Sequence, residues 1–193
     1  MLKEMIKSFK MKCLALIAIV FLGLVGCSKD EAGADPQLKV SDAMAVTNAD
    51  MIGHWQLSRM MADTLVDLDD DNSFSKNLLD ETDCFNTMSI TFKKDGTFIS
   101  NNAQMSFEAG ASQNEFSCLS DRMDSGNWEV RNDSLILEMQ INGETYIHRK
   151  LINFESDRFS FDVNKIESNQ YVNDPGDTQA SAIRILELEY SRK

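Results

Sequence analysis

The chain has 193 residues and a formal net charge of −12, from 31 acidic and 19 basic residues. This acidic balance argues against nucleic-acid binding, because like-charged phosphates would be repelled. It also argues against a domain that lies flat on an anionic membrane surface. The length suits one domain together with N-terminal processing and linker segments.

The first residues predict a cleaved, lipid-modified export signal. A basic start, Lys3 to Lys12, precedes the apolar run CLALIAIVFLGLVG and then Cys27. Such a run is typical of a signal peptide and is short for a membrane span of about 20 residues. Its end, LVGC, resembles a bacterial lipobox. This resemblance implies that residues 1–26 are removed and that Cys27 is acylated, which would anchor the protein to a membrane.

The segment after the cysteine is expected to be a flexible tether. Residues 27–47 are small and polar, and their acidic start, SKDEAGAD, resembles the surface-export signals of Bacteroidetes lipoproteins. We therefore expect an outer-membrane lipoprotein, exposed at the cell surface or on the periplasmic face. A coil of about 20 residues spans roughly 25 Å, which would lift the following domain clear of the lipid headgroups.

From residue 48 onward the sequence predicts one all-β domain, because apolar residues alternate at strand spacing. The expected strands are, in chain order, HWQLSRMMA, NTMSITFK, TFIS, SGNWEVR, SLILEMQI, ETYIHRKLINF, RFSFDV and AIRILELEY. Turn signals join several of them, most clearly Asp95-Gly96 and Asn142-Gly143. Eight sequential strands with no long helix between them favour an antiparallel up-and-down barrel over residues 48–193.

The order of these motifs resembles that of the lipocalin-like lipoproteins of Bacteroidetes. GHW opens the first strand after a short turn that Thr47 can cap, and ITFKKDGTF, GNWEV, DSLIL and ILELEYSR follow. The likeness covers nearly all of the chain after the tether. It implies a calycin-type barrel whose floor includes Gly53 and Trp55. A basic residue of the last strand, Arg192 or Arg184, would pack on this tryptophan.

The acidic stretch DLDDDNSF, between the first two strands, is either a calcium loop or a solvated acidic loop. Its alternate positions offer hard oxygens at the spacing of the first ligands of an EF-hand loop. The candidate ligands are Asp67, Asp69, Asp71, Ser73 and, from beyond the standard loop, Glu81. Two residues depart from that pattern, since Asn72 replaces the usual glycine and Leu78 the bidentate glutamate. Calcium is thus a candidate cofactor, and no other is expected.

Two cysteines, Cys84 and Cys118, remain beyond the signal and the lipidation site. In an exported chain they are expected to form one disulfide, with two buried thiols as the alternative. Cys118 is expected in a polar connection between strands. The bridge would then hold the long first loop against a later loop near one rim of the barrel.

No catalytic motif is recognisable in the chain. It has no G-x-S-x-G, no P-loop and no H-E-x-x-H, and its only two histidines are His54 and His148. We therefore do not expect an enzyme.

The inward positions predicted for the barrel are mostly large and apolar. Those assigned to a ligand cavity are Leu57, Met88, Ile90, Phe92, Leu137, Met139, Phe159 and Phe161. An eight-stranded barrel has an interior that side chains can fill or that can hold one small ligand. The expected function is binding of a small hydrophobic ligand at the cell envelope. The alternative is a filled barrel that binds a protein partner in an envelope complex.

Overall fold

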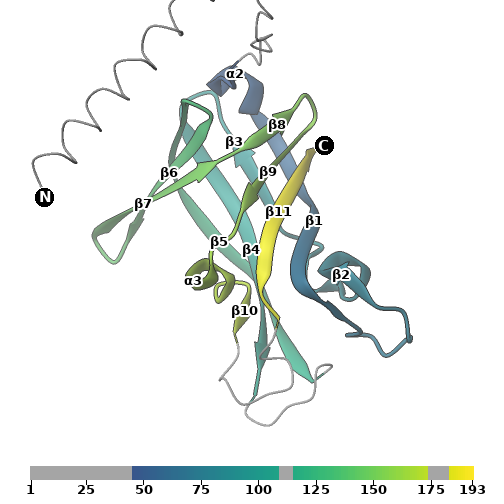
Figure 1. The fold of residues 1–193 in the computed structure, drawn as a ribbon. Coiled ribbons are helices and arrows are strands. Elements are labelled where there is room, and N and C mark those ends of the chain that lie inside the picture. Colours follow the sequence, from purple (N-terminus) through teal and green to yellow (C-terminus); the bar gives the residue numbers. More distant parts are fainter. Residues whose placement is uncertain (1–44, 109–114, 174–182) are drawn as a thin grey trace, which may run out of the picture. The chain divides into compact units, whose positions relative to one another are not determined.

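The computed structural model describes residues 45–108, 115–173 and 183–193 (Figure 1). The expected signal peptide, the lipidated Cys27 and the tether as far as residue 44 lie outside the described residues. Met44–Lys193 forms one compact unit by itself. Among the described residues, no helix has the length and apolar character needed to cross a membrane.

Strands make up most of the described chain, and short helical turns connect some of them. The elements are, in chain order, α2 (Asn48–Met51), β1 (Gly53–Val66), β2 (Ser75–Asn77), the 3-10 turns η2 (Leu78–Asp80) and η3 (Asp83–Phe85), β3 (Ser89–Phe92), β4 (Thr97–Phe107), β5 (Phe116–Arg131), β6 (Ser134–Ile141), β7 (Glu144–Leu151), β8 (Asn153–Glu155), β9 (Arg158–Asp162), α3 (Lys165–Ser168), β10 (Val172–Asn173) and β11 (Ile185–Arg192). The all-β class expected from the sequence is confirmed.

The strands form one sheet that curls into a half-barrel (Figure 1). Neighbouring strands follow the order β7-β6-β5-β4-β3-β1-β11-β9-β8. Every pair along this path is antiparallel, and β11 returns to lie beside β1. The two residues of β10 pair in parallel with β4. Short turns and antiparallel pairing are what the sequence predicted for a lipocalin-like barrel.

All eight expected strands are present, and they correspond to β1, β3, β4, β5, β6, β7, β9 and β11. The expected strand ETYIHRKLINF is divided into β7 and β8. Buried Ile152 separates β7, which pairs with β6, from β8, which pairs with β9. This division carries the chain from one edge of the sheet to the other. In the part of the chain that the structure describes, no β-ladder joins β7 to β9, so a seam remains along the barrel.

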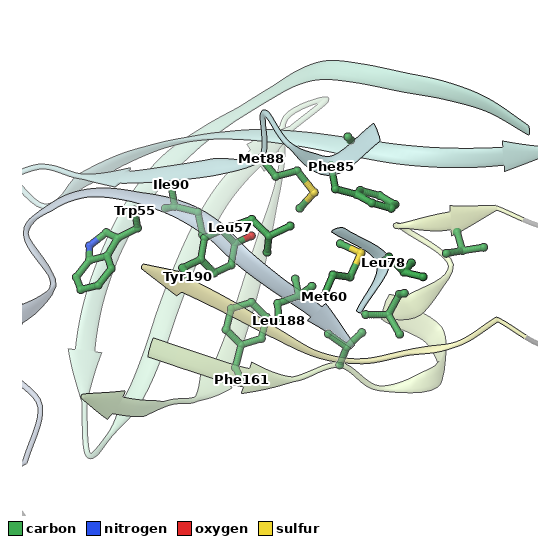
Figure 2. Packing of buried hydrophobic residues seen from close by; sticks show 14 of the residues in the cluster. Trp55, Leu57, Met60, Leu78, Phe85, Met88, Ile90, Phe161, Leu188 and Tyr190 are labelled. Atoms are coloured by element: carbon green, nitrogen blue, oxygen red, sulfur yellow. The ribbon is translucent and has the colours of Figure 1, made fainter. Parts of the chain in front are cut away.

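The hydrophobic core lies between β1, β3 and β11 and the strands that face them. Figure 2 shows Trp55 at one end of this core and Phe85 with Leu78 at the other, with Leu57, Ile90 and Tyr190 between. Trp55, Phe85 and Leu78 are each 0% exposed. Full burial of such side chains is worth about 1.5–3 kcal/mol each, so the core holds the sheet in its curled form.

The disulfide expected from the sequence is present between Cys84 and Cys118. Its position differs from the expectation in one respect, because Cys118 lies on β5, opposite Met105 of β4, and not in a loop. The polar connection predicted around Cys118 is instead the first half of β5. This half is exposed on both faces, and it therefore lacks the apolar alternation that marks a strand. The bridge fastens η3 to this strand.

Candidate functional site

A cavity of about 440 Å³ lies between the strands of the half-barrel and the segment that follows α3. One part of its wall is apolar, formed by Ile90, Phe98, Leu135, Leu137, Met139, Ile141 and Phe161. The other part is polar, formed by Ser100, Asn102, Arg122, Asp124, His148, Lys150, Gln170, Tyr171 and Tyr190. The site thus combines a large apolar surface with a few hydrogen-bonding groups, as small-molecule pockets do.

Half of the residues assigned to the cavity from the sequence line it. These four are Ile90, Leu137, Met139 and Phe161. The other four, Leu57, Met88, Phe92 and Phe159, are buried in the core around it. The polar part of the wall was not anticipated, because apolar alternation selects only apolar residues.

A β-bulge places Arg122 and Asp124 beside the cavity. The β4–β5 register shifts between Asn102 and Gln104, and Asp121 has the positive φ of +63°. Arg122 and Asp124 then pair with Asn102 and Ser100, which also line the cavity. Bulges re-aim side chains in this way, so this polar cluster owes its position to one extra residue in β5.

Asp124 is the centre of this polar cluster. Its Oδ2 accepts a hydrogen bond from Nδ2 of Asn102 at 2.8 Å and lies 3.4 Å from Nε of Arg122. Asn102 also donates to the hydroxyl of Ser100 at 3.1 Å. The carboxylate is therefore held by two partners from within the wall.

Lys150 bridges the seam between the edges of the sheet. From β7, its ammonium donates to the carboxylate of Glu167 on α3 and to the carbonyl of Asp162 on β9, the latter at 3.2 Å. It also lies 5.4 Å from the ring centre of Phe161. Burial alone would raise the pKa of Glu167, but the hydrogen bond from Lys150 and that from the Asn164 backbone hold the pKa below its usual value.

Two tyrosines of the wall keep their phenol groups neutral. Burial raises the pKa of Tyr171 to about 12 and the pKa of Tyr190 well above its usual value. Tyr190 is only 2% exposed. Among the described residues, neither hydroxyl has a hydrogen-bond partner, so both can pair with a polar atom of a ligand.

The floor residues come together as the sequence resemblance implied. The guanidinium of Arg192 lies 4.2 Å from the ring centre of Trp55, and its Nη1 donates to the carbonyl of Ile52 at 2.7 Å. Trp55 Nε1 donates to the carbonyl of Met51 at 2.7 Å. A Cβ on Gly53, whose φ is +139°, would lie 2.8 Å from Arg192 Nη1. The floor is thus a packed structural unit, and Arg192 rather than Arg184 covers the tryptophan.

The acidic loop gathers three of the five residues proposed to bind calcium. Carboxylate oxygens of Asp67, Asp69 and Asp71 all lie within 4.8 Å of one another. Asn72 has a φ of +65°, the conformation for which an EF-hand loop normally uses glycine. The N–H of Ser73 donates to Asp71 at 2.6 Å.

Glu81 lies apart from these three aspartates. It is only 4% exposed, and its Oε2 accepts a hydrogen bond from the N–H of Leu68 at 3.1 Å. It thus holds the start of the loop instead of completing the group of three.

One family model matches most of the chain. It is described as a domain of unknown function, DUF5004, and it matches residues 29–172. No curated protein and no solved structure is significantly similar to the chain. The chain belongs to the DUF5004 family, whose description names no activity, ligand or partner.

Proposed function

We propose that this member of the DUF5004 family is a lipocalin-like lipoprotein of the bacterial outer membrane, of the kind found in Bacteroidetes. It binds a small, mainly apolar molecule inside its half-barrel. The observation that carries this proposal is the cavity of about 440 Å³ with its apolar wall. This volume falls within the range of about 300–1,000 Å³ that is usual for ligand pockets.

Native mass spectrometry of the chain from residue 28, which lacks the signal peptide and the lipidated Cys27, tests the binding proposal. Protein purified without detergent should carry, or take up from a lipid extract, one molecule of defined mass per chain. A chain that retains its fold but takes up no small molecule from extracts or from neutral dyes would contradict the proposal.

The membrane anchor is a separate part of the proposal. The sequence LVGC supports acylation of Cys27, and the acidic residues after it support surface display. Labelled fatty acid should be incorporated into the full chain and should be lost in Cys27→Ala. Incorporation that persists in this variant would contradict an anchor at Cys27.

We also propose that the acidic loop binds Ca²⁺. Three carboxylates this close repel one another unless a cation lies between them, and their backbone spacing matches an EF-hand loop. Ser73 would supply a further oxygen. Calorimetric titration should detect one Ca²⁺ per chain and lose it in Asp69→Asn, whereas Asp157→Asn, in a distant turn, should bind normally. Absence of Ca²⁺ binding at millimolar concentration would contradict this proposal.

Binding of an envelope protein is a second candidate function. Edge strand β7 exposes large apolar side chains, with Tyr146 at 42%, Ile147 at 62% and Leu151 at 71% exposed. Exposed apolar edges are common sites of protein contact. A photo-crosslinker at position 147 should then capture one discrete envelope protein in cells, and Leu151→Asp should prevent this. Capture that is unaffected by Leu151→Asp would contradict a specific contact.

A further inference from the structure

Arg122 is the charged group of the cavity wall whose hydrogen-bonding capacity is least used. Its only ion pair in the described chain joins Nε to Asp124 at 3.4 Å. Nη1 and Nη2 have no hydrogen-bond partner among the described residues. An arginine carries five N–H donors in a planar fork, and two of its nitrogens can bind a carboxylate or phosphate together. Arg122 therefore has a free face suited to an anion.

The other charges of the wall are already engaged. Lys150 is bound to Glu167 and to the carbonyl of Asp162, and Asp124 is held by Asn102 and Arg122. The two tyrosines add no negative charge, since burial keeps both phenols neutral at physiological pH. His148 also lines the wall and adds no negative charge to it. Asp124 is the nearest carboxylate to an anion bound at Arg122, and its Oδ2 already contacts Asn102 and Nε of Arg122.

Exposure distinguishes the interior of the cavity from its rim. Phe98 and Leu135 are each 1% exposed, and Phe161 is 7% exposed, so the innermost part of the wall is apolar and buried. The side chain of Arg122 is 51% exposed, and Ile141 on the same wall is 43% exposed. The guanidinium thus lies where a charged group can stay partly hydrated while an attached apolar chain is buried. This arrangement fits a molecule with one charged end.

From this geometry we infer that the ligand is an amphiphile with an acidic headgroup, bound by the guanidinium of Arg122 at the rim, with its apolar body inside the half-barrel. This inference rests on the proposed binding function and names the class of ligand. Carboxylates and phosphates share the required chemistry, because both accept two parallel hydrogen bonds from one arginine.

Four probes with the same apolar chain test this inference: dodecanol, dodecanoate, dodecyl phosphate and dodecylammonium. Each displaces Nile red, a neutral dye, from the mature chain at pH 7, below the probe's micelle concentration. Dodecanoate or dodecyl phosphate should bind at least about tenfold more tightly than dodecanol, since a hydrogen bond between two charged groups is stronger than one to a neutral hydroxyl. Dodecylammonium should bind no more tightly than dodecanol. The stronger of the two anions identifies the headgroup.

Arg122→Gln should remove the preference for the anions and leave the affinity for dodecanol within about twofold. Arg131→Gln is the matched control, because Arg131 lies on the same strand, is exposed, and pairs with Glu129 outside the cavity. This control should retain the preference. The comparison of probes on the unchanged protein does not depend on how well either variant folds.

Two outcomes would overturn the inference while preserving the proposed function. One is equal binding of all four probes, and the other is an anion preference that Arg122→Gln leaves unchanged. Failure of every probe to displace the dye, or of the dye to bind, would instead contradict the proposed function itself. The two failures are therefore distinguishable in one set of titrations.

Discussion

Gly53 is a single position on which the floor of the half-barrel depends. Its φ of +139° disfavours any side chain, and a Cβ there would lie 2.8 Å from Nη1 of Arg192. Gly53→Ala should therefore both strain the backbone and displace Arg192 from Trp55, at a cost of about 2–3 kcal/mol in the free energy of unfolding. Urea denaturation measures this cost.

Gly143→Ala is the control that separates these two effects. Gly143 also has a positive φ, of +83°, but a Cβ there would meet nothing within 4 Å. Its substitution should cost about 1 kcal/mol from backbone strain alone. Equal costs for Gly53→Ala and Gly143→Ala would show that the contact with Arg192 adds nothing.

The hydroxyl of Tyr190 is expected to contribute to ligand binding but not to the stability of the empty protein. Tyr190 is a buried residue that lines the cavity, and its hydroxyl has no partner in the described chain. Tyr190→Phe should therefore leave the thermal midpoint unchanged or slightly higher, because no protein hydrogen bond is lost. The same change should weaken a ligand that bonds to the hydroxyl, by roughly three- to tenfold. A midpoint lowered by several degrees in the empty protein would show that the hydroxyl has a structural partner.

At the scale of elements, the contact of Lys150 with Glu167 connects β7 to α3 across the seam. The side chains are 15% and 20% exposed, so loss of one partner in Glu167→Gln should cost about 1–3 kcal/mol. The pKa of Glu167 is lowered in the folded state, so its contribution is present above its unfolded pKa of about 4.5. This contribution is lost as the pH falls through the lower folded value.

Urea titrations between pH 3 and 7 test this dependence. The native protein should lose stability more steeply below pH 4.5 than Glu167→Gln does. Glu155→Gln removes the exposed pair with Arg158 and should change the stability by less than about 1 kcal/mol. Parallel pH profiles for the native protein and Glu167→Gln would contradict a role for this pair at the seam.

The disulfide joins two elements that are 34 residues apart in the chain. In the chain-entropy model, closing a loop of this length stabilises the folded state by about 3–4 kcal/mol. Reduction, or the double change Cys84→Ser with Cys118→Ser, should lower the denaturant midpoint accordingly. A midpoint that does not respond to reductant would show that the bridge is absent or unimportant in solution.

Sequence reasoning found the long strands because each buries one face and shows apolar alternation. It missed β2 and β10, which have three and two residues and are too short for a pattern, and it did not predict that ETYIHRKLINF divides into β7 and β8. It also missed the first half of β5, whose polar residues are exposed on both faces. The capped turn was recognisable in the sequence, because Thr47 is followed three residues later by Asp50. In the structure Thr47 donates to Asp50 from both its N–H and its hydroxyl.

For the candidate site, the apolar wall was more predictable than the polar wall. One signal was nevertheless present in the sequence, since the two-residue turn at Asn142-Gly143 sets the β6–β7 register. That register places His148 opposite Leu137 and Lys150 opposite Leu135, and both basic residues line the cavity. The position of Arg122 on the cavity wall was not predictable, because it depends on a β-bulge for which the sequence contains no recognisable signal.

At the scale of the whole molecule, the half-barrel combines a packed floor with an interior that is incompletely filled. Trp55 and its neighbours close one end of the half-barrel. A cavity of about 440 Å³ remains inside it, and its wall includes residues of β3, β4, β5, β6, β7, β9 and β11. Native cores are close-packed, with few voids larger than a water molecule. A space of this size is what the proposed binding of a small ligand requires.

The most direct measurement is a Nile red titration of Leu137→Trp, which would fill the cavity from β6. The control is Ile147→Trp, at an exposed position on the neighbouring strand. We predict saturable binding of one dye per chain in the native protein and in the control, and at least about tenfold weaker binding in folded Leu137→Trp. Equal binding in all three proteins would contradict a ligand site inside the half-barrel.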